Sequence, residues 1–377
     1  MTASNRTARR LREPGANHGA PTAYFAAVHD TFLRAGEAAG GFVDHFYIIG
    51  GYHVRLRFAG PSLVPQITPA LEHLKVPAPH ASSALTICLW DSASTGATPP
   101  PPVWGEGDLP AGGEVPGYND ERISTTFMIG SGTLSMLDRE SDLALFWVPD
   151  AQTLPGYEIA APLRTILHWW MGDHARRMVH AGAVGTLSGG VLLAGRGGVG
   201  KSTTALSCLL SGLLYLGDDY VLLDTEPVAF VHSLYSSGKL HVDQLGWFPQ
   251  LSPTISEHQL PSEEKMLLLL HDNFDRIRKG LPIRAVLLPR VTGLAQTRLR
   301  SASAADSLRA LAPSTIFQLP GASRAALQQI KRFVEQVPSY VLELGRDVHQ
   351  VPRVVSQLLA EPEDSTILAY RRRERES

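Results

Sequence analysis

The pattern of apolar and polar residues divides the chain into helical and extended segments. Apolar residues recur at helical spacing between 22 and 36, which predicts a helix there. Strict alternation from His53 to Phe58, just after Gly50-Gly51, predicts a pair of strands over 42–58. A helix is expected over 62–74, broken or kinked by two prolines. Further strands are predicted at 85–90, 124–129, 133–137 and 143–148, the last three as an antiparallel meander.

Strand and helix patterns alternate in the second half of the chain. Pro162 can start a helix whose apolar face includes Ile166 and Trp170. The remaining pattern predicts strands at 178–184, 191–194, 213–217, 220–223 and 283–288, and helices at 204–210, 304–312 and 322–337. The predicted fold class is therefore α/β for this half, preceded by an α+β domain. The expected divisions are a disordered tail at 1–20, an N-terminal domain at 21–152, a catalytic domain at 153–362 and a polar tail at 363–377.

A glycine-rich loop joins the predicted strand at 191–194 to the predicted helix at 204–210. Its sequence fits glycine, four residues, Gly-Lys-Ser, the pattern of a phosphate-binding loop, and strand and helix flank it as that motif requires. Backbone N–H groups and the helix N-terminus would bind phosphates. Lys201 would neutralise the β- and γ-phosphates and Ser202 would hold Mg²⁺. The predicted nucleotide-binding residues are Gly195, Arg196, Gly197, Gly198, Val199, Gly200, Lys201, Ser202 and Thr203.

Two adjacent carboxylates, Asp218 and Asp219, follow the predicted strand at 213–217. If that strand belongs to a parallel sheet, its carboxyl end lies near the phosphate loop, where ligands of such sheets bind. One carboxylate can then hold Mg²⁺, directly or through water, and the other can take a proton from an acceptor hydroxyl. The alternative is a turn with two solvated acids. Asp224 and Glu226 have the pattern of turn residues.

Composition excludes several classes of function. A net charge of −2 with 19% charged residues gives no general attraction to nucleic acid or to an anionic membrane. The two cysteines lie in apolar segments without metal-ligand spacing, as buried thiols of a reducing cytosol do. No segment approaches the roughly 18 apolar residues of a membrane span, and no secretory signal is recognised. We therefore expect a cytoplasmic protein with no nucleic-acid or membrane partner.

Three features together resemble the catalytic domain of HPr kinase/phosphorylase, a family related to ATP-dependent phosphoenolpyruvate carboxykinase. They are His180, the loop from Gly195 to Ser202, and Leu216-Gly217-Asp218-Asp219. The resemblance covers about residues 155 to 360 and implies a P-loop kinase domain. It includes the closing pattern at 340–345 and the helix at 354–359, which resemble the HPr-kinase-like proteins of lasso-peptide gene clusters.

The resemblance also implies roles for individual residues. Lys201 and Ser202 match the phosphate and magnesium contacts. Asp218 matches the general base and Asp219 a ligand of the metal or of its water, although the two could exchange these roles. His180 would lie beside the base and tune it; a lone histidine is otherwise more typical of a packed strand.

The chain departs from the family pattern after the Asp-Asp pair. The family's glutamate-and-arginine signature is not recognisable, and His232 to Lys239 stands in its place. The departure argues against the phosphorylase reaction and against HPr as substrate. Lys239 is a candidate phosphate or substrate contact, with a solvated lysine as the alternative. Arg290, after the predicted strand at 283–288, is a candidate for transition-state charge, as is Arg298; a surface arginine is the alternative for both.

The function that these features favour is an ATP- and Mg²⁺-dependent kinase acting on a serine-type hydroxyl of a peptide or protein, such as a lasso-type precursor peptide. The alternatives are a kinase of small-molecule hydroxyls, a switch ATPase of the ParA/MinD kind, and a degenerate kinase that only binds nucleotide. The N-terminal domain has no recognisable catalytic motif. We expect its sheet edges to receive an extended peptide beneath the loop at 97–117, or the domain to form a homo-oligomer.

Overall fold

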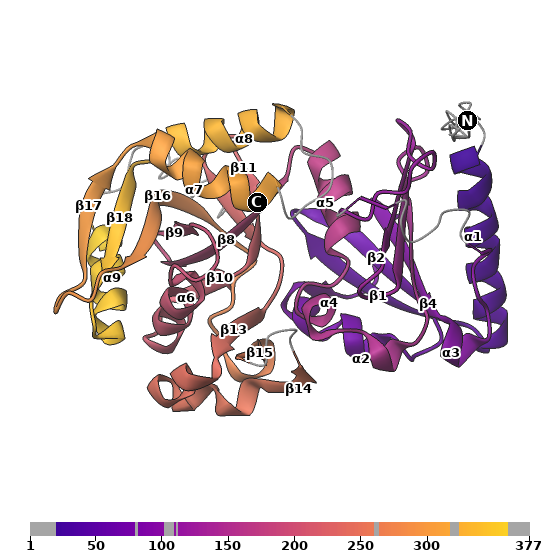
Figure 1. The fold of residues 1–377 in the computed structure, drawn as a ribbon, viewed down its shortest axis with the longest axis horizontal. Helices are drawn as coiled ribbons and strands as arrows, with labels where there is room; N and C mark the ends of the chain where they lie inside the picture. The colour runs from indigo at the N-terminus through magenta and orange to yellow at the C-terminus, as the bar shows by residue number, and fades with distance from the viewer. Residues whose placement is uncertain are drawn as a thin grey trace, which may run out of the picture.

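The structure is a computed structural model that describes residues 20–79, 82–101, 109–110, 112–259, 264–316 and 324–360. The two predicted tails, apart from Ala20, lie outside these residues, as does part of the loop at 97–117. Among the described helices, none combines the length and the apolar character needed to cross a bilayer. The fold is mixed α/β with three sheets (Figure 1).

The first sheet has seven strands in the order β3-β1-β2-β4-β7-β6-β5. The predicted hairpin and the antiparallel meander are both confirmed, but β4 lies between them and pairs in parallel with β2 and β7. The strands are β1 (Phe42–Ile49), β2 (Tyr52–Ala59), β3 (Lys75–Val76), β4 (Leu85–Asp91), β5 (Ile123–Met128), β6 (Thr133–Asp138) and β7 (Leu143–Val148).

Helices cover both faces of this sheet. On one face, α1 (Ala20–Ala38) packs Phe25, Val28 and Phe32 against Trp90 and other buried strand residues. The predicted helix at 62–74 is split by its prolines into α2 (Val64–Ile67) and the 3₁₀ turn η1 (Pro69–Leu74). These lie on the other face together with α4 (Gly156–Ala160) and α5 (Arg164–Asp173). Two short segments complete this half, α3 (Ser92–Thr95) and η3 (Ala151–Thr153).

The second sheet has eight strands, and β9 lies between β8 and β16 near its middle. Its members are β8 (Arg177–Thr186), β9 (Gly189–Ala194), β10 (Leu214–Gly217), β11 (Tyr220–Asp224), β12 (Phe230–Ser233), β16 (Gly280–Val291), β17 (Arg298–Ala302) and β18 (Ser339–Leu344). A third sheet, in the order β13-β15-β14, consists of β13 (Ser237–His241), β14 (Ile255–Gln259) and β15 (Lys265–Leu269).

The expectation of a parallel sheet around the Asp-Asp pair is wrong for its immediate neighbour, because β10 runs antiparallel to β8. However, β8 is also antiparallel to β9. Strands β9 and β10 therefore run in the same direction and end at the same edge of the sheet. The parallel pairs β9–β16 and β16–β18 bring the end of β16 to that edge too. Strand β16 is longer than predicted, so that Pro289 and Arg290 belong to it.

Helices also cover both faces of the second sheet. Apolar residues of α6 (Lys201–Leu210) and α9 (Val351–Ala360) pack on one face, and those of α7 (Ala304–Ile316) and α8 (Arg324–Glu335) on the other. Helix α6 begins three residues before the predicted start and ends at Leu210; Gly212, two residues further on, has the left-handed φ of 90° expected of a helix-ending glycine. Four 3₁₀ segments complete the described elements: η4 (Val242–Trp247), η5 (Pro249–Thr254), η6 (His271–Asn273) and η7 (Val348–Gln350).

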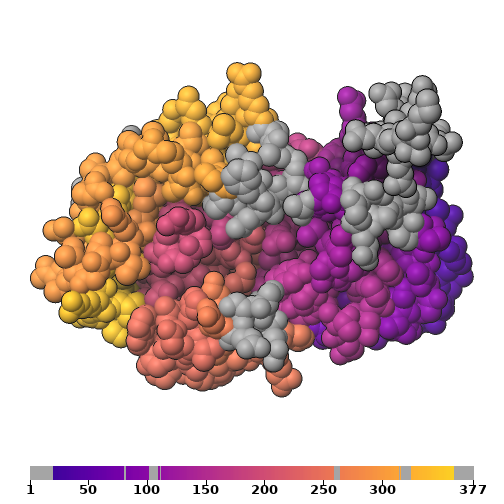
Figure 2. Space-filling view, in the orientation of Figure 1, coloured from indigo at the N-terminus to yellow at the C-terminus, as the bar shows by residue number. Residues whose placement is uncertain are grey.

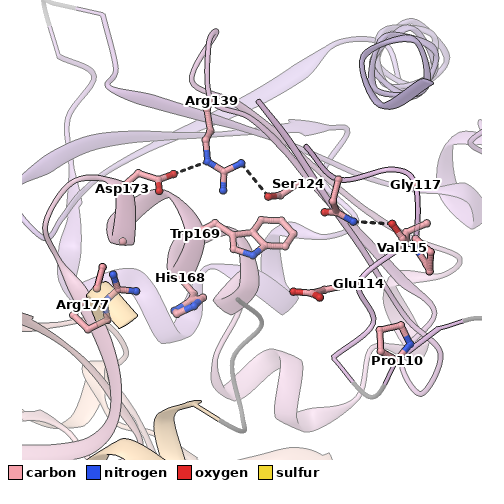
Figure 3. A pocket seen from close by; sticks show the side chains of 14 residues that line it. Pro110, Glu114, Val115, Gly117, Ser124, Arg139, His168, Trp169, Asp173 and Arg177 are labelled. Carbon is pink, nitrogen blue, oxygen red and sulfur yellow. Dashed lines mark hydrogen bonds and ion pairs between the residues drawn. The ribbon is translucent and has the colours of Figure 1, made fainter. Parts of the chain in front are cut away.

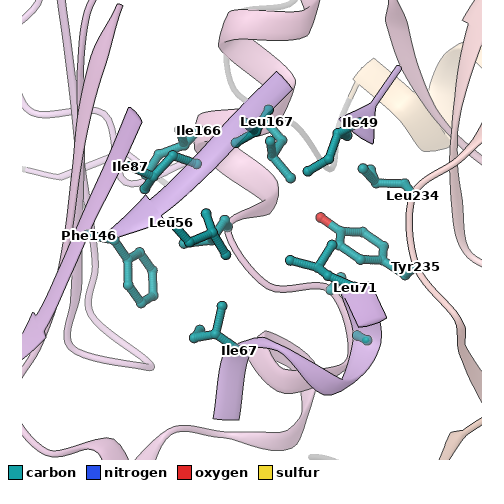
Figure 4. Close-up of a cluster of buried hydrophobic side chains, with 14 of the residues drawn as sticks. Ile49, Leu56, Ile67, Leu71, Ile87, Phe146, Ile166, Leu167, Leu234 and Tyr235 are labelled. Carbon is teal, nitrogen blue, oxygen red and sulfur yellow. The ribbon is translucent and has the colours of Figure 1, made fainter. Parts of the chain in front are cut away.

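The two halves of the molecule share one hydrophobic cluster. It joins Leu56, Leu71 and Ile87 of the first half to Leu234 and Tyr235 of the second (Figure 4). The hydroxyl of Tyr235 donates a hydrogen bond of 2.9 Å to the carbonyl of Pro162 inside this cluster. The halves lie side by side in the space-filling view (Figure 2). The packing thus runs across the predicted boundary at residues 152–153.

Candidate active site

The glycine-rich loop lies between the end of β9 and the start of α6. Gly200, directly before the helix, has φ of 102°, and a Cβ there would come within 2.6 Å of the Leu344 side chain. Only glycine meets both constraints. The ammonium of Lys201 is buried and donates to the loop carbonyls of Gly195 (2.6 Å) and Arg196 (3.2 Å). Burial lowers the pKa of Lys201, so that an anion beside it would stabilise its charged form.

The Asp-Asp pair forms a bend between β10 and β11, which both pair with β8; it is called here the Asp-Asp bend. Gly217 of β10 pairs with Ala183, and Tyr220 of β11 pairs with His180, so that β10 and β11 continue one another along β8. The Asp-Asp bend packs closely on β8, where a Cβ on Gly182 would lie 3.1 Å from the Cα of Asp218. A glycine on β8 therefore permits the approach of the two strands at this point.

Asp218 points toward the start of α6. Its Oδ2 accepts a hydrogen bond of 3.0 Å from the backbone N–H of Lys239, and the Ser202 side chain lies close enough to act on its pKa. Burial, and next the charge of Asp219, raise the pKa of Asp218 to about 6. The contact with Ser202 joins the predicted phosphate loop to the predicted carboxylate pair.

Asp219 has a different environment, because both of its oxygens face positive or donating groups. Oδ2 lies 2.5 Å from the Lys239 ammonium, and Oδ1 lies 2.9 Å from Nε2 of His180. Burial acts to raise the pKa of Asp219, but Lys239 and His180 together outweigh it and lower that pKa. For Lys239 burial likewise opposes the charged form, and Asp219 outweighs it and raises the pKa. The two adjacent carboxyl groups therefore have very different pKa values, raised at Asp218 and lowered at Asp219.

Three of the predicted site residues thus meet at the Asp-Asp bend from separate elements. His180 comes from β8, Ser202 from α6 and Lys239 from β13. Lys239 is a half-buried partner of Asp219 rather than a solvated lysine. Thr203 lies beside Gln244, with 3.4 Å between its hydroxyl and the amide oxygen.

Arg164 and Tyr220 also belong to this site, although neither lies in a recognisable motif. The Arg164 guanidinium lies 5.3 Å from the centroid of the Tyr220 ring, and its Nη1 lies 3.3 Å from the phenolic oxygen. Tyr220 follows Asp219 directly, and its ring lies 5.5 Å from that of His180. Arg164 is close enough for Asp219 to act on its pKa. An arginine at the start of an apolar helix carries no signal that distinguishes it from a surface residue.

Arg290 lies beside the phosphate loop, as the parallel pairing of β9 and β16 requires. It lines a cavity of about 400 Å³ together with Gly195, Arg196 and Val199 of the loop and Arg309 of α7. The apolar residues Leu288, Pro289 and Val341 form the rest of its wall with Ala194, Ala310 and Pro313. Arg298 lies elsewhere, with its Nε 2.6 Å from Glu343 in a surface ion pair. Of the two arginine candidates, Arg290 therefore lies beside the phosphate loop and Arg298 does not.

Asp224, interpreted from the sequence as a turn residue, is a buried residue at the end of β11. Its Oδ2 lies 2.9 Å from Nη1 of Arg176. The reason is tertiary, because β11 is enclosed between β8 and β12 and Arg176 precedes β8. Glu226 is exposed, as a turn residue should be, and lies 3.6 Å from Arg332.

The oxygens available for a metal ion are few. Among the described residues, no cluster of three or more histidine, cysteine, aspartate or glutamate side chains could hold an ion. Mg²⁺ at a nucleotide is usually held by one or two protein oxygens, phosphates and water, so that a dedicated cluster is not required. The contact between Ser202 and Asp218 supplies a hydroxyl and a carboxylate at one point. Asp219 follows Asp218 directly, so that the Ser202 hydroxyl and one of the two carboxylates fit Mg²⁺ delivered with a nucleotide.

No protein-family model and no curated protein matches this chain. Among solved structures, the Hpr(Ser) kinase/phosphatase from Coxiella burnetii is similar to it, with 12% sequence identity and a TM-score of 0.26. The match covers 53% of this chain and 99% of that protein. At so low a TM-score the similarity carries no argument, and the functional conclusion below depends on the site itself.

Proposed function

We propose that this protein is an ATP-dependent kinase that transfers the γ-phosphoryl group to a serine-type hydroxyl. One observation carries the proposal: Ser202 of the phosphate loop lies close enough to Asp218 of the Asp-Asp bend to act on the pKa of that carboxyl. A phosphate loop by itself supports nucleotide binding. A buried carboxylate of raised pKa beside that loop adds a group able to accept the hydroxyl proton.

The loop residues Gly195 to Thr203 would hold the ATP phosphates, with the Lys201 ammonium turned from its loop carbonyls toward them. Ser202 would hold Mg²⁺, with Asp219 acting on it through a water. ATP would supply the phosphoryl group and Mg²⁺ would neutralise its charge. Arg290 and Arg196, on the wall of the neighbouring cavity, are placed to contact phosphate or nucleotide.

Asp218 is the better base of the pair. With a pKa of about 6 it is ionised at neutral pH and still basic enough to accept a proton. The pKa of Asp219 is lowered by Lys239 and His180, which makes it a poor proton acceptor and a permanent anion. His180 and Lys239 act as positioning residues. They hold Asp219 in place and thereby the Asp-Asp bend that carries Asp218.

The acceptor is proposed as a peptide or protein, and a lasso-type precursor peptide is the first to try. The expected docking at the edge of the first sheet is disfavoured at β5. There the N–H of Val115 donates to Thr125 (3.1 Å) and the N–H of Phe127 to Gly113 (2.8 Å). This chain's own segment at 113–115 therefore occupies that edge over these residues, so that a peptide must be received elsewhere.

A radiolabelled transfer assay with Asp218→Asn tests the kinase proposal. The variant should bind ATP with unchanged affinity and lose transfer by 10²-fold or more, the order expected for loss of a general base. Asp30→Asn, an exposed carboxylate on α1, is the matched control and should behave as the unmodified protein.

Light scattering with and without ATP tests the rival switch ATPase. ATP-dependent dimerisation with no transfer to any peptide or small hydroxyl compound would overturn the kinase proposal. Transfer to small hydroxyl compounds but to no peptide would support the kinase proposal and show that the acceptor is a small molecule.

A further inference from the structure

A larger cavity, of about 590 Å³, lies between the first sheet and α5, away from the phosphate loop (Figure 3). Its polar and aromatic lining consists of Glu114, Asn119, Ser124, Arg139, His168, Trp169, Asp173 and Arg177. None of its described lining residues belongs to the loop at 195–203. Volumes of this size are typical of small-molecule sites.

Arg177 is the unusual member of the lining. Its side chain is 8% exposed, and its Nε donates to Oε1 of Gln329 on α8 at 2.9 Å. Among the described residues, the only hydrogen-bond acceptor of this guanidinium is Gln329, which leaves the two terminal nitrogens without a protein acceptor. The guanidinium stays charged, although burial lowers its pKa. Because Arg177 lines the cavity, an oxyanion there could accept two parallel hydrogen bonds from these terminal nitrogens.

The neighbouring carboxylates do not meet this need. Asp173 acts on Arg177 at a distance, but its Oδ2 accepts from Nε of Arg139 at 2.8 Å. Arg139 is further fixed by a bond of 3.0 Å to the Ser124 hydroxyl. Glu114 is exposed and lies on the other side of Trp169 from Arg177 (Figure 3). Arg177 is therefore the cationic side chain of the lining that can bind an anionic ligand.

The cavity is also distinct from the candidate active site. Arg177 and His180 are both on β8 and are three residues apart, so that their side chains leave opposite faces of the strand. Arg177 contacts α8 and His180 contacts Asp219. A ligand bound to Arg177 therefore does not lie against the carboxylate pair.

We propose that this cavity binds a small organic anion carrying a carboxylate or phosphate group. Arg177 is its charged contact and the mostly buried indole of Trp169 its apolar wall. This is a second ligand site, independent of the proposed kinase reaction.

Calorimetric titration of the full chain with malonate and with inorganic phosphate tests the proposal. Phosphate is titrated in the Lys201→Ala background, so that the phosphate loop does not contribute to its binding. Saturable binding of either probe is expected, and the tighter one distinguishes a carboxylate from a phosphate ligand. Absence of saturable binding of both at millimolar concentration would overturn the proposal.

Three variants locate the binding. Arg177→Gln should weaken it about tenfold or more, the usual effect of losing a charge-assisted hydrogen bond. Gly172→Ala keeps the charge but places a Cβ 3.1 Å from Nη1 of Arg177, and should also weaken binding. Glu114→Gln removes a negative charge from the lining without touching the core, and should tighten it.

Gly172→Ala and Glu114→Gln decide the question if Arg177→Gln does not fold. Binding that is unchanged in both would overturn the proposal. ATP binding should be unaffected by all three variants, which separates failure at this cavity from failure of the proposed nucleotide site.

Discussion

The ammonium of Lys239 lies 2.5 Å from Oδ2 of Asp219, and both side chains are half-buried. The same lysine donates its backbone N–H to Asp218. One residue of β13 thus fixes both carboxylates of the Asp-Asp bend between β10 and β11. The arrangement keeps Asp219 ionised and leaves Asp218 with the raised pKa.

Lys201→Ala should abolish measurable ATP binding while preserving the fold. Without the ammonium, the phosphates lose their point charge within the loop. Calorimetric titration of the purified protein measures this, with circular dichroism to confirm folding. Lys331→Ala, an exposed lysine on α8, is the matched control and should bind ATP normally. Equal ATP affinity in Lys201→Ala would remove residues 195–202 from the nucleotide site.

Transfer activity at saturating ATP should rise with pH through about 6 and then level off. Only ionised Asp218 can accept the hydroxyl proton, and its pKa is raised to about 6 by burial and by Asp219. A pH–rate profile of the chemical step measures this. A profile that is flat between pH 5 and 7 would exclude Asp218 as the base.

Asp218→Asn should increase the stability of the nucleotide-free protein at pH 7. The folded pKa of Asp218 is raised from 3.8 to about 6, so that native Asp218 retains a proton which the unfolded chain releases. Stability of the unmodified protein therefore falls as pH rises from about 4 to 6, by roughly 3 kcal/mol from this group. The amide removes this dependence. Urea unfolding of both proteins at several pH values measures the difference.

Asp219→Asn should act in the opposite direction and destabilise the protein by about 1.5–3 kcal/mol at pH 7, because it removes the charged partner of the half-buried Lys239 ammonium. The pKa of Asp219 is lowered in the folded state, so that its contribution is present above the unfolded pKa and is lost as pH falls. The same urea unfolding experiment tests it. Equal stability of the two asparagine variants at pH 7 would contradict the assigned difference between the aspartates.

Leu71→Ala should destabilise both halves of the molecule together. Leu71 is fully buried in the cluster that joins the two halves. The cavity should lower the free energy of unfolding by about 2–5 kcal/mol. Fluorescence and circular dichroism during thermal unfolding should give one shared transition, shifted to lower temperature. Two separate transitions, with only the first affected, would show that the halves fold independently.

The hydrophobic cluster shared by the two halves makes a truncated protein a poor test of acceptor recognition. A fragment of residues 155–362 would expose Leu234, Tyr235 and other apolar residues that face the first half. Variants in the full chain are therefore the better way to separate acceptor recognition from nucleotide binding.

Local features of this protein were determined by its sequence. The loop at 195–202 needs particular residues at fixed spacing, and its flanking strand and helix follow from short-range periodicity. For the same reason the hairpin at Gly50-Gly51, the proline-split helix and the position of Asp218-Asp219 were all predictable. These properties depend on neighbours within a few residues along the chain.

Tertiary structure alone decided how distant residues meet. The sequence could not show that β10 runs antiparallel to β8, that Lys239 and His180 hold the two oxygens of Asp219, or that Arg164 reaches Tyr220. Nor could it show that Asp224 is buried or that Arg177 faces a cavity. The charge state of a carboxyl and the partner of an arginine depend on burial and on side chains from other strands. Those are set only when the sheets have paired and packed.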